Sequence, residues 1–202
     1  FNQAIKLNSK YIYINDSSKT EKLKKLIGKK KIKLVSNFED IHKIFKKKID
    51  ITMSAVSGID GLKYNLMIIK HTKKILLANK ESIICGWNLI QKQLMKYKTI
   101  YQPVDSEHFA IYELMKNIDN NMLKDIYITA SGGPFLNTKL RDLKNISIKK
   151  ALNHPKWKMG KKISIDSATL MNKIFEVMEA YRLFNFSKNK IKILIHPQSC
   201  VH

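Results

Sequence analysis

The chain has 202 residues, which is enough for one large domain or two small ones with a sizeable buried core. Its formal net charge of +22 would suggest a nucleic-acid-binding protein, but every basic residue except Arg141 and Arg182 is a lysine. Because specific recognition of bases and phosphates favours arginine, we expect a solvated basic surface that attracts small anions, and no nucleic-acid partner.

Cysteine content and hydropathy indicate the redox compartment and whether the chain spans a membrane. Cys85 and Cys200 are the only cysteines and lie far apart, which fits neither a disulfide framework nor a metal motif and favours a reducing compartment. No apolar run approaches the roughly 18 residues that a membrane span needs, so no membrane association is expected. The sequence begins with Phe1 and ends at His202 directly after a strand-like run, and we expect a piece of a longer protein.

Short β-branched runs alternate with segments of helical spacing through residues 1–98. This alternation predicts a mostly parallel sheet with helices on both faces. Strands are expected at residues 11–14, 32–36, 49–56 and 74–78, and helices at residues 19–26, 38–45, 62–69 and 82–97.

From residue 99 the alternation continues, but the strand ends now carry polar side chains, and the whole chain is therefore expected to be an α/β protein. An irregular segment is expected at residues 151–160, and Asp166 or Ser167 is expected to cap a helix that runs to about Phe184. Further strands are expected at residues 99–104, 127–130, 163–165 and 191–195, and a helix at residues 109–115.

Two carboxylates separated by one residue follow the strand at residues 99–104. Asp105 and Glu107 thus lie where a parallel sheet places its ligands, and hard divalent cations such as Mg²⁺ prefer carboxylate oxygens. An alternative reading stays open, in which Ser106 caps the following helix and Glu107 interacts with the helix dipole.

Two other strand ends carry groups that suit an anion. Lys80 follows the strand at residues 74–78 and can hold a carbonyl or anionic oxygen, although a capped turn is the alternative. Ser131, Gly132 and Gly133 follow the strand at residues 127–130 and present a hydroxyl and backbone N–H groups, a suitable phosphate cradle. A tight turn explains these three residues equally well.

The predicted helix after Ser167 carries Asn172, Lys173 and Glu176 at spacings of three and four residues, so the three side chains can share one face. Ser167 would lie at the N-terminal end of that helix, where anions bind. A surface ion pair is the alternative. Upstream, the segment at residues 154–160 combines proline and glycine with large rings, the composition of a loop that closes over a ligand or of a connector with a buried Trp157.

Six segments occur in an order and at a spacing that together resemble the 1-deoxy-D-xylulose 5-phosphate reductoisomerase family. Each segment is modest alone, and the resemblance covers roughly residues 49–202. The segments are LANKES (77–82), PVDSEH (103–108), TASGGPF (129–135), HPKWKMG (154–160), IDSATLMNK (165–173) and IHPQS (195–199).

This resemblance implies an oxidoreductase and isomerase that uses NADPH and a divalent metal, Mn²⁺ or Mg²⁺ with Co²⁺ as a further option. It would convert the phosphosugar 1-deoxy-D-xylulose 5-phosphate to 2-C-methyl-D-erythritol 4-phosphate in the non-mevalonate route to isoprenoids. The family is commonly a homodimer, in the bacterial cytoplasm or a plastid. The implied organisation is a partial Rossmann-like NADPH-binding domain, residues 1–98, followed by an α/β (α+β) catalytic domain, residues 99–202, with the metal and substrate site and a flap loop.

The same resemblance implies roles for individual residues. Asp105, Glu107 and Glu176 would be the metal ligands, and together with Lys80 and His154 they would form the catalytic set. The residues that match positions touching NADPH are Asn79, Glu81 and Gly160.

Substrate binding would involve both ends of the molecule. Lys80 and Ser106 would contact the hydroxyl and carbonyl end, with Glu107 and Glu176 nearby. His154 would reach the substrate from the flap, with Trp157 and Met159 closing over the site. The phosphate and its neighbouring hydroxyls would be held by Ser131, Ser167, Asn172 and Lys173.

The chain departs from the family pattern at several points. The glycine-rich dinucleotide loop would precede Phe1, and the C-terminal helical domain would follow His202. Ile174 stands where the family has a glycine, and Phe109 where a smaller residue is usual. We therefore expect the 202-residue chain to retain the site residues but to show little or no turnover.

Two other functions would use part of the same residues. A Mg²⁺-dependent aldolase or phosphohydrolase would use the carboxylates and the phosphate cradle without NADPH. A basic nucleic-acid-binding module would bind in a salt-dependent manner and would be indifferent to Asp105 and Glu107.

Overall fold

The computed structural model describes residues 1–201, apart from the side chain of Asn120. The chain folds as two compact units, Phe1–Ile49 and Asp50–His202. The domain boundary expected between residues 98 and 99 lies inside the second unit and stays a prediction. Among the described residues, no helix combines the length and the apolar composition needed to cross a lipid bilayer.

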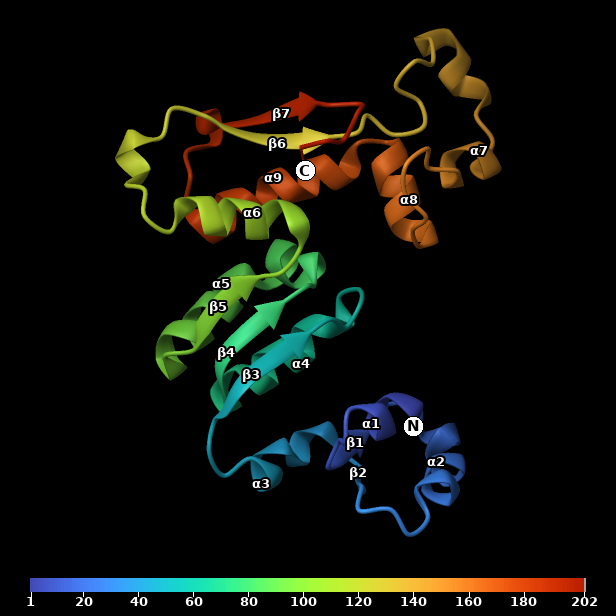
Figure 1. The fold of residues 1–202 in the computed structure, drawn as a ribbon, viewed down its shortest axis with the longest axis vertical. Coiled ribbons are helices and arrows are strands. Elements are labelled where there is room, and N and C mark those ends of the chain that lie inside the picture. The colour runs from blue at the N-terminus through green and yellow to red at the C-terminus, as the bar shows by residue number, and fades with distance from the viewer. Residues whose placement is uncertain (202) are drawn as a thin grey trace. The chain divides into compact units, whose positions relative to one another are not determined.

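The first unit contains a two-stranded parallel sheet, drawn in blue in Figure 1. Ile12 on β1 lies opposite Leu34 on β2. The connecting helix α2 buries Leu23 and Ile27 and ends at Gly28, whose φ of 49° is in the left-handed region. In chain order the elements are α1 (Asn2–Lys6), β1 (Tyr11–Tyr13), η1 (Ser17–Lys19), α2 (Thr20–Ile27), β2 (Lys33–Val35), η2 (Phe38–Asp40) and α3 (Ile41–Ile44).

The second unit begins with a three-stranded sheet of order β3-β4-β5. β4 and β5 are parallel, with Leu77 opposite Pro103, and the arrow of β3 points the same way in Figure 1. The carboxyl ends of β4 and β5 therefore meet at one edge, where α5 and α6 begin. These elements are β3 (Ile49–Ser54), α4 (Asp60–Ile68), η3 (Ile69–His71), β4 (Thr72–Leu77), α5 (Lys80–Tyr97), β5 (Ile100–Pro103) and α6 (Ser106–Met115).

A second, two-stranded parallel sheet follows, in which Ala130 at the end of β6 lies opposite Ile195 at the end of β7. Figure 1 shows this sheet lying on α9, and α9 also packs against α5, α6 and α8. Ile111, Ile128 and Ala180 join α6, β6 and α9 in a common apolar core. The elements are η4 (Asn120–Met122), β6 (Ile126–Ala130), η5 (Leu140–Asn145), α7 (Ile148–Leu152), α8 (Lys161–Ala168), α9 (Met171–Phe184), η6 (Lys188–Lys190) and β7 (Ile191–Ile195).

Side-chain caps fix where the helices at the sheet edge begin. The Asn79 side chain accepts a hydrogen bond from the Ser82 backbone N–H, which caps α5. Asp105 does the same for α6 by accepting from the His108 N–H. Because each cap directly follows a strand, the residues next to it are held at the sheet edge.

The α/β prediction is confirmed, and every expected strand except one is present within two residues of its expected bounds. The strand expected at residues 163–165 is wrong: those residues lie inside α8. Alternation over three residues is too short to separate a strand from a helix, and Gly160 begins the helix here. The single helix expected up to Phe184 is also wrong, because Leu170 adopts φ 59° and separates α8 from α9.

Candidate active site

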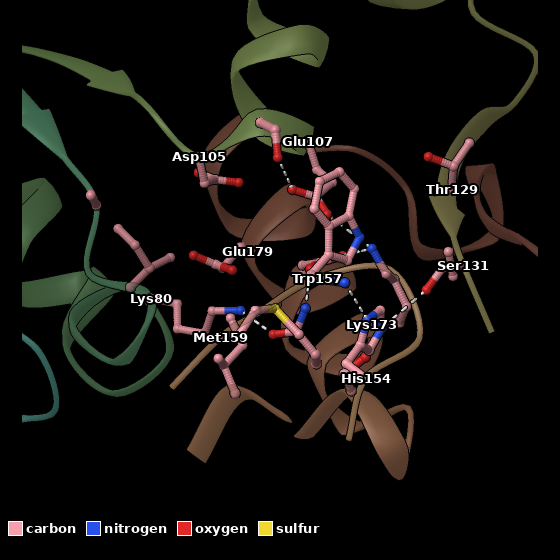
Figure 2. A pocket seen from close by; sticks show the side chains of 18 of the residues that line it. Lys80, Asp105, Glu107, Thr129, Ser131, His154, Trp157, Met159, Lys173 and Glu179 are labelled. Atoms are coloured by element: carbon pink, nitrogen blue, oxygen red, sulfur yellow. Dashed lines mark hydrogen bonds and ion pairs between the residues drawn. The ribbon is translucent and has the colours of Figure 1, made fainter. Parts of the chain in front are cut away.

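A cavity of about 420 Å³ in the second unit is lined by the strand ends and helix starts that the sequence singled out. In Figure 2, Lys80, Asp105 and Glu179 lie on one side, and Ser131 and His154 on the other. The cavity collects all the predicted substrate-binding and metal-ligating residues. They are Lys80, Asp105, Ser106, Glu107, Ser131, His154, Ser167, Asn172, Lys173 and Glu176.

Helix α9 supplies a buried charged stripe to the cavity. Lys173, Glu176 and Glu179 recur every third residue and are only 8%, 3% and 5% exposed. The Lys173 ammonium nitrogen lies 2.5 Å from Oε2 of Glu176 as an ion pair, and it donates a hydrogen bond of 3.0 Å to Oε1 of Glu107. Lys173 thus joins a carboxylate on α9 to one on α6, so the prediction that Asn172, Lys173 and Glu176 share a functional face fits the structure better than a surface ion pair.

The start of α6 carries the Asp105–Glu107 pair. Asp105 both caps the helix and hydrogen-bonds Nδ1 of His108. His108 is fully buried, and its Nε2 lies 2.9 Å from the Glu176 backbone oxygen. Ser106 donates a hydrogen bond of 2.8 Å to Glu107. The expectation that Ser106 caps the helix is wrong, because Asp105 forms the cap. Glu107 lines the cavity, and the interpretation of Asp105 and Glu107 as metal ligands stays a prediction.

Lys80 lies at the first position of α5 and completes a polar chain. Its ammonium donates a hydrogen bond to the Asn172 side-chain oxygen, and the Asn172 amide donates to Oε1 of Glu176. Lys80 is therefore more than part of a turn: its charged end lies within the cavity, in contact with the functional face of α9.

A tight glycine turn lies at the end of β6, and its expected role as a phosphate cradle stays a prediction. Gly132 and Gly133 have φ values of 90° and 70°, which L side chains rarely adopt. A Cβ on Gly133 would lie 2.9 Å from the Ser167 carbonyl oxygen, so only glycine permits this close approach. A small hollow of about 20 Å³ lies between this turn and α8 and α9, lined also by Asn172 and Lys173. Ser167 reaches it from the last turn of α8, which corrects its expected place at a helix N-terminus.

His154 lies on the same side of the cavity as Ser131 and is 9% exposed. Its Nδ1 accepts hydrogen bonds from the backbone N–H groups of Lys156 and Trp157, at 3.2 and 3.0 Å. Nε2 therefore carries the proton and faces the Ser131 hydroxyl at 3.3 Å. Burial lowers the pKa of His154, which keeps the imidazole neutral. Trp157 and Met159 line the cavity from the same segment.

The carboxylates of the cavity differ in their proton affinity. Burial is the largest single influence on Glu107 and opposes its ionisation, but the charge of Lys173 and the hydrogen bonds from Lys173, Ser106 and the backbone together lower the pKa of Glu107 to about 2. Burial and the nearby charge of Glu107 raise the pKa of Glu176 to about 7. Burial also raises the pKa of Glu179 to about 7. Among the three glutamates of the cavity, Glu107 is therefore firmly ionised near neutral pH, whereas Glu176 and Glu179 exchange a proton readily.

The fit of a divalent cation depends on the same carboxylates. Asp105, Glu107 and Glu176 offer the hard oxygen donors that Mg²⁺ and Mn²⁺ prefer, and Oε2 of the buried Glu176 is paired with the Lys173 ammonium. Within residues 1–201, however, no three Asp, Glu, His or Cys side chains converge closely enough to form a ligand set, because Lys173 lies between Glu107 and Glu176. The donor chemistry fits, and the ligand assignment stays a prediction.

Of the three residues expected to contact NADPH, Asn79 lines the cavity, and Glu81 and Gly160 directly follow the lining residues Lys80 and Met159 in the chain. The Asn79 side chain is 3% exposed and donates to the Gly58 carbonyl oxygen at 2.9 Å and to Glu81 at 3.1 Å. Glu81 also forms an ion pair of 3.1 Å with Lys162 in the first turn of α8. Gly160 precedes that turn, and a Cβ there would meet no atom within 4 Å. The structure thus links Glu81 to the start of α8 and leaves open space at Gly160, which suits a ligand at these positions, while the assignment itself stays a prediction.

Sequence reasoning missed three residues of this site. Glu179 lines the cavity, and its signal was available, since it continues the spacing of Lys173 and Glu176 by three residues. His108 belongs to a quoted segment but received no role. Ser199 lines the cavity from the loop after β7 with a φ of 55°, and a loop residue of this kind leaves no periodic signal.

The fold and the cavity define an α/β protein in which charged side chains gather at the carboxyl ends of parallel strands. Residues 1–86 match the family model of 1-deoxy-D-xylulose 5-phosphate reductoisomerase, and residues 101–184 match that of its C-terminal domain. The chain belongs to the 1-deoxy-D-xylulose 5-phosphate reductoisomerase family. The family resemblance expected from the six segments is therefore confirmed.

Two of the similar relatives, each named 1-deoxy-D-xylulose 5-phosphate reductoisomerase, come from bacteria. The protein from Pelagibacter ubique is 54% identical over 197 residues, covering 96% of this chain and 51% of the relative. The protein from Wolbachia pipientis wMel is 44% identical over 201 residues, covering 99% of this chain and 51% of the relative. The chain thus spans about half the length of the curated relatives it matches.

Solved structures of 1-deoxy-D-xylulose 5-phosphate reductoisomerases have a similar fold. The enzyme from Zymomonas mobilis in complex with NADPH superposes with a TM-score of 0.88 at 36% identity, covering 100% of this chain and 52% of the other. A reductoisomerase in complex with NADPH, fosmidomycin and magnesium superposes with a TM-score of 0.84 at 35% identity, with the same coverage.

Proposed function

We propose that this chain carries the substrate and metal site of an enzyme that converts 1-deoxy-D-xylulose 5-phosphate to 2-C-methyl-D-erythritol 4-phosphate with NADPH. The observation that carries the proposal is the convergence of Lys80, Glu107, Ser131 and Lys173 on one cavity, although they come from four separate matched segments. A surface that served only nucleic acid or structure would not require buried acidic and basic groups to face a shared hollow.

The phosphate group of the substrate would bind on the side of the cavity where Ser131 lies. The two glycines of the turn line a small hollow, and Ser167, Asn172 and Lys173 surround it. Lys173 supplies the positive charge that a phosphate dianion needs. Ser131 and the protonated Nε2 of His154 supply hydrogen-bond donors on the flap side.

The reacting end of the substrate would lie near Lys80 and Ser106. Lys80 donates to a carbonyl or hydroxyl oxygen in place of its present contact with Asn172, and Ser106 contacts a hydroxyl. A divalent cation held by Asp105, Glu107 and Glu176 would stabilise negative charge on the substrate oxygens, and NADPH would supply the hydride. Glu176, whose pKa is about 7, can lose its proton as a cation enters.

The segment with His154, Trp157 and Met159 would exclude water. The two large apolar side chains line the cavity, while His154 is anchored through Nδ1 to the backbone of the same segment. Excluding water strengthens the electrostatic contacts of Lys80 and Lys173 with the substrate.

The proposal extends to the cofactor edge, the assembly and the compartment. Asn79, Glu81 and Gly160 would touch NADPH, the complete protein would be a homodimer with a Rossmann-like cofactor domain, and it would work in the bacterial cytoplasm. The bacterial relatives favour this compartment over the plastid.

Two measurements test the proposed function. Calorimetry with the 202-residue chain and Mn²⁺ should detect 1-deoxy-D-xylulose 5-phosphate binding, and Lys173→Gln should weaken it at least about tenfold through the lost phosphate contact. In the full reading frame, the same substrate should drive oxidation of NADPH, whereas the 202-residue chain should show little or none. Absence of substrate binding in both proteins would refute the proposal, and robust turnover by the 202-residue chain would refute the expectation of an inactive half.

A further inference from the structure

Helix α5 is kinked close to the cavity. Gly86 has φ −125° and ψ 15°, outside the helical region, in the second turn after Lys80. Leu62 on α4 packs at this point: a Cβ on Gly86 would lie 2.4 Å from a Leu62 methyl carbon. The kink separates a short first segment of α5, which carries the cavity residues Lys80 and Ile83, from the longer remainder of the helix.

Arg182 on α9 binds the backbone of that first segment. One guanidinium nitrogen donates a hydrogen bond of 2.6 Å to the Ile83 carbonyl oxygen and a second one to the Ile84 carbonyl oxygen. These two oxygens are the regular helical acceptors for the N–H groups just after Gly86. A side chain that enters the hydrogen-bond ladder is a recognised cause of helix kinks.

The position of Arg182 on α9 gives this contact its significance. It lies three residues after Glu179. A step of three residues turns the helix by about 300°, so Arg182 projects about 60° away from Glu179 and on the side of α9 opposite Lys173. α9 therefore supplies charged groups to the site from one side and holds the start of α5 from another. At the cavity, the same two helices meet again through Lys80 and Asn172.

We propose that Arg182 is a positioning residue that fixes the first segment of α5 on α9 and thereby sets the Lys80 ammonium against Asn172 and Glu176. The positioning role for catalysis rests on the proposed function, whereas the mechanical contact does not. Phosphate-binding groups on α8, α9 and the turn after β6 do not depend on Arg182. Its loss should consequently affect turnover more than substrate affinity.

The test compares Arg182→Leu, Arg182→Lys and Arg141→Leu in the full-length protein. Arg141 is the matched control, because it is the only other arginine in the chain and pairs with Asp142 on the surface. Arg182→Leu should lower kcat roughly tenfold or more with KM changed less than about threefold, since a small displacement of Lys80 suffices. Hydrogen exchange of the amides of residues 83–90 should quicken about tenfold. Arg182→Lys should give intermediate values, and Arg141→Leu the wild-type ones.

Each outcome decides the proposal. Unchanged exchange in Arg182→Leu, a parallel loss of kcat and substrate affinity, or the same effect in Arg141→Leu would overturn it. If Arg182→Leu does not fold, Arg182→Lys becomes the deciding variant, because a single ammonium cannot donate hydrogen bonds as the guanidinium does. Wild-type kcat and wild-type hydrogen exchange in Arg182→Lys would overturn the proposal. A lower kcat at unchanged KM would support it. If the wild-type protein does not turn the substrate over, the proposed function fails, and exchange alone decides whether Arg182 holds α5.

Discussion

The ammonium nitrogen of Lys173 lies 3.0 Å from Oε1 of Glu107, although the two residues belong to different helices. Their side chains are only 10% and 12% exposed, and Glu176 at 2.5 Å completes the group. Lys173 thus occupies the space between two carboxylates that a divalent cation would share. If a cation binds as proposed, the ammonium and the cation would compete for the same oxygens, which would link metal binding to the stability of the cavity.

Lys173→Gln should destabilise the metal-free protein by about 3 kcal/mol, because it leaves two buried carboxylates without their counter-charge. Added Mn²⁺ should restore much of that stability by supplying positive charge at the same oxygens. Urea unfolding after treatment with a chelator, with and without Mn²⁺, measures both effects. Lys116→Gln is the control, since its pair with Glu113 is half exposed and should cost less than about 1 kcal/mol. Equal losses in the two variants would contradict this reading of Lys173.

Asp105→Asn should reduce Mn²⁺ affinity at least about tenfold and lower kcat severely in the complete enzyme while the fold survives. Asparagine also caps helices well, so α6 should still begin at residue 106. Mn²⁺ titration followed by electron paramagnetic resonance reports the affinity, and circular dichroism reports the fold. Asp142→Asn on the exposed 3₁₀ segment is the control. Wild-type Mn²⁺ binding by Asp105→Asn would remove Asp105 from the metal site.

Gly133→Ala should cost at least about 1 kcal/mol of folding free energy and weaken binding of the phosphorylated substrate. Its φ of 70° disfavours an L side chain, and the new Cβ would lie 2.9 Å from the Ser167 carbonyl oxygen. Gly160→Ala is the stability control, because its φ is −63° and a Cβ there meets open space. Thermal unfolding and substrate calorimetry compare the two. If Gly133→Ala proves as stable as Gly160→Ala, the turn after β6 is less constrained than the structure indicates.

Stability should depend on pH through His108. Burial alone would lower the pKa of His108, but the hydrogen bond and charge of Asp105 raise it to about 9. Because the folded state then binds the proton more tightly than the unfolded state, whose pKa is about 6.5, the contribution is complete below that pH and is lost as pH rises through about 9. The shift corresponds to about 3 kcal/mol.

His108→Gln, which cannot titrate, isolates this contribution. The difference in unfolding free energy between the wild type and His108→Gln should be greatest near pH 6 and shrink towards pH 10, as measured by urea unfolding in the presence of a chelator. His42→Gln, at an exposed position, should show no such trend. A difference that stays constant over this range would mean that His108 is neutral in the folded protein.

Much of the fold could be predicted because its signals are local. The strands that precede Lys80 and Asp105 are apolar runs with polar residues immediately after them, and the structure places both at one sheet edge. The break at Leu170 could not be predicted in this way. Leucine normally favours a helix, and only the packing of α8 and α9 around the glycine turn imposes its left-handed backbone.

The contacts of the site also divide into those that the sequence predicts and those that it does not. Lys173 and Glu176 share a helix, so their proximity follows from spacing alone. The link from Lys173 to Glu107 and the contact from Arg182 to the Ile83 carbonyl oxygen join segments far apart in the chain. Periodicity carries no information about which two helices meet, so such contacts required the structure or the resemblance to a family.

The charged stripe of α9 makes the length of that helix as important as its composition. Each residue advances an α-helix by about 100°, so one insertion between Lys173 and Glu179 would turn the later side chains out of the cavity. Arg182 would leave the carbonyl oxygens of α5 in the same event. Conservative substitutions outside the stripe should thus be tolerated more readily than any change in residue number, and a library of single-residue insertions along α9 should be permissive only after Arg182.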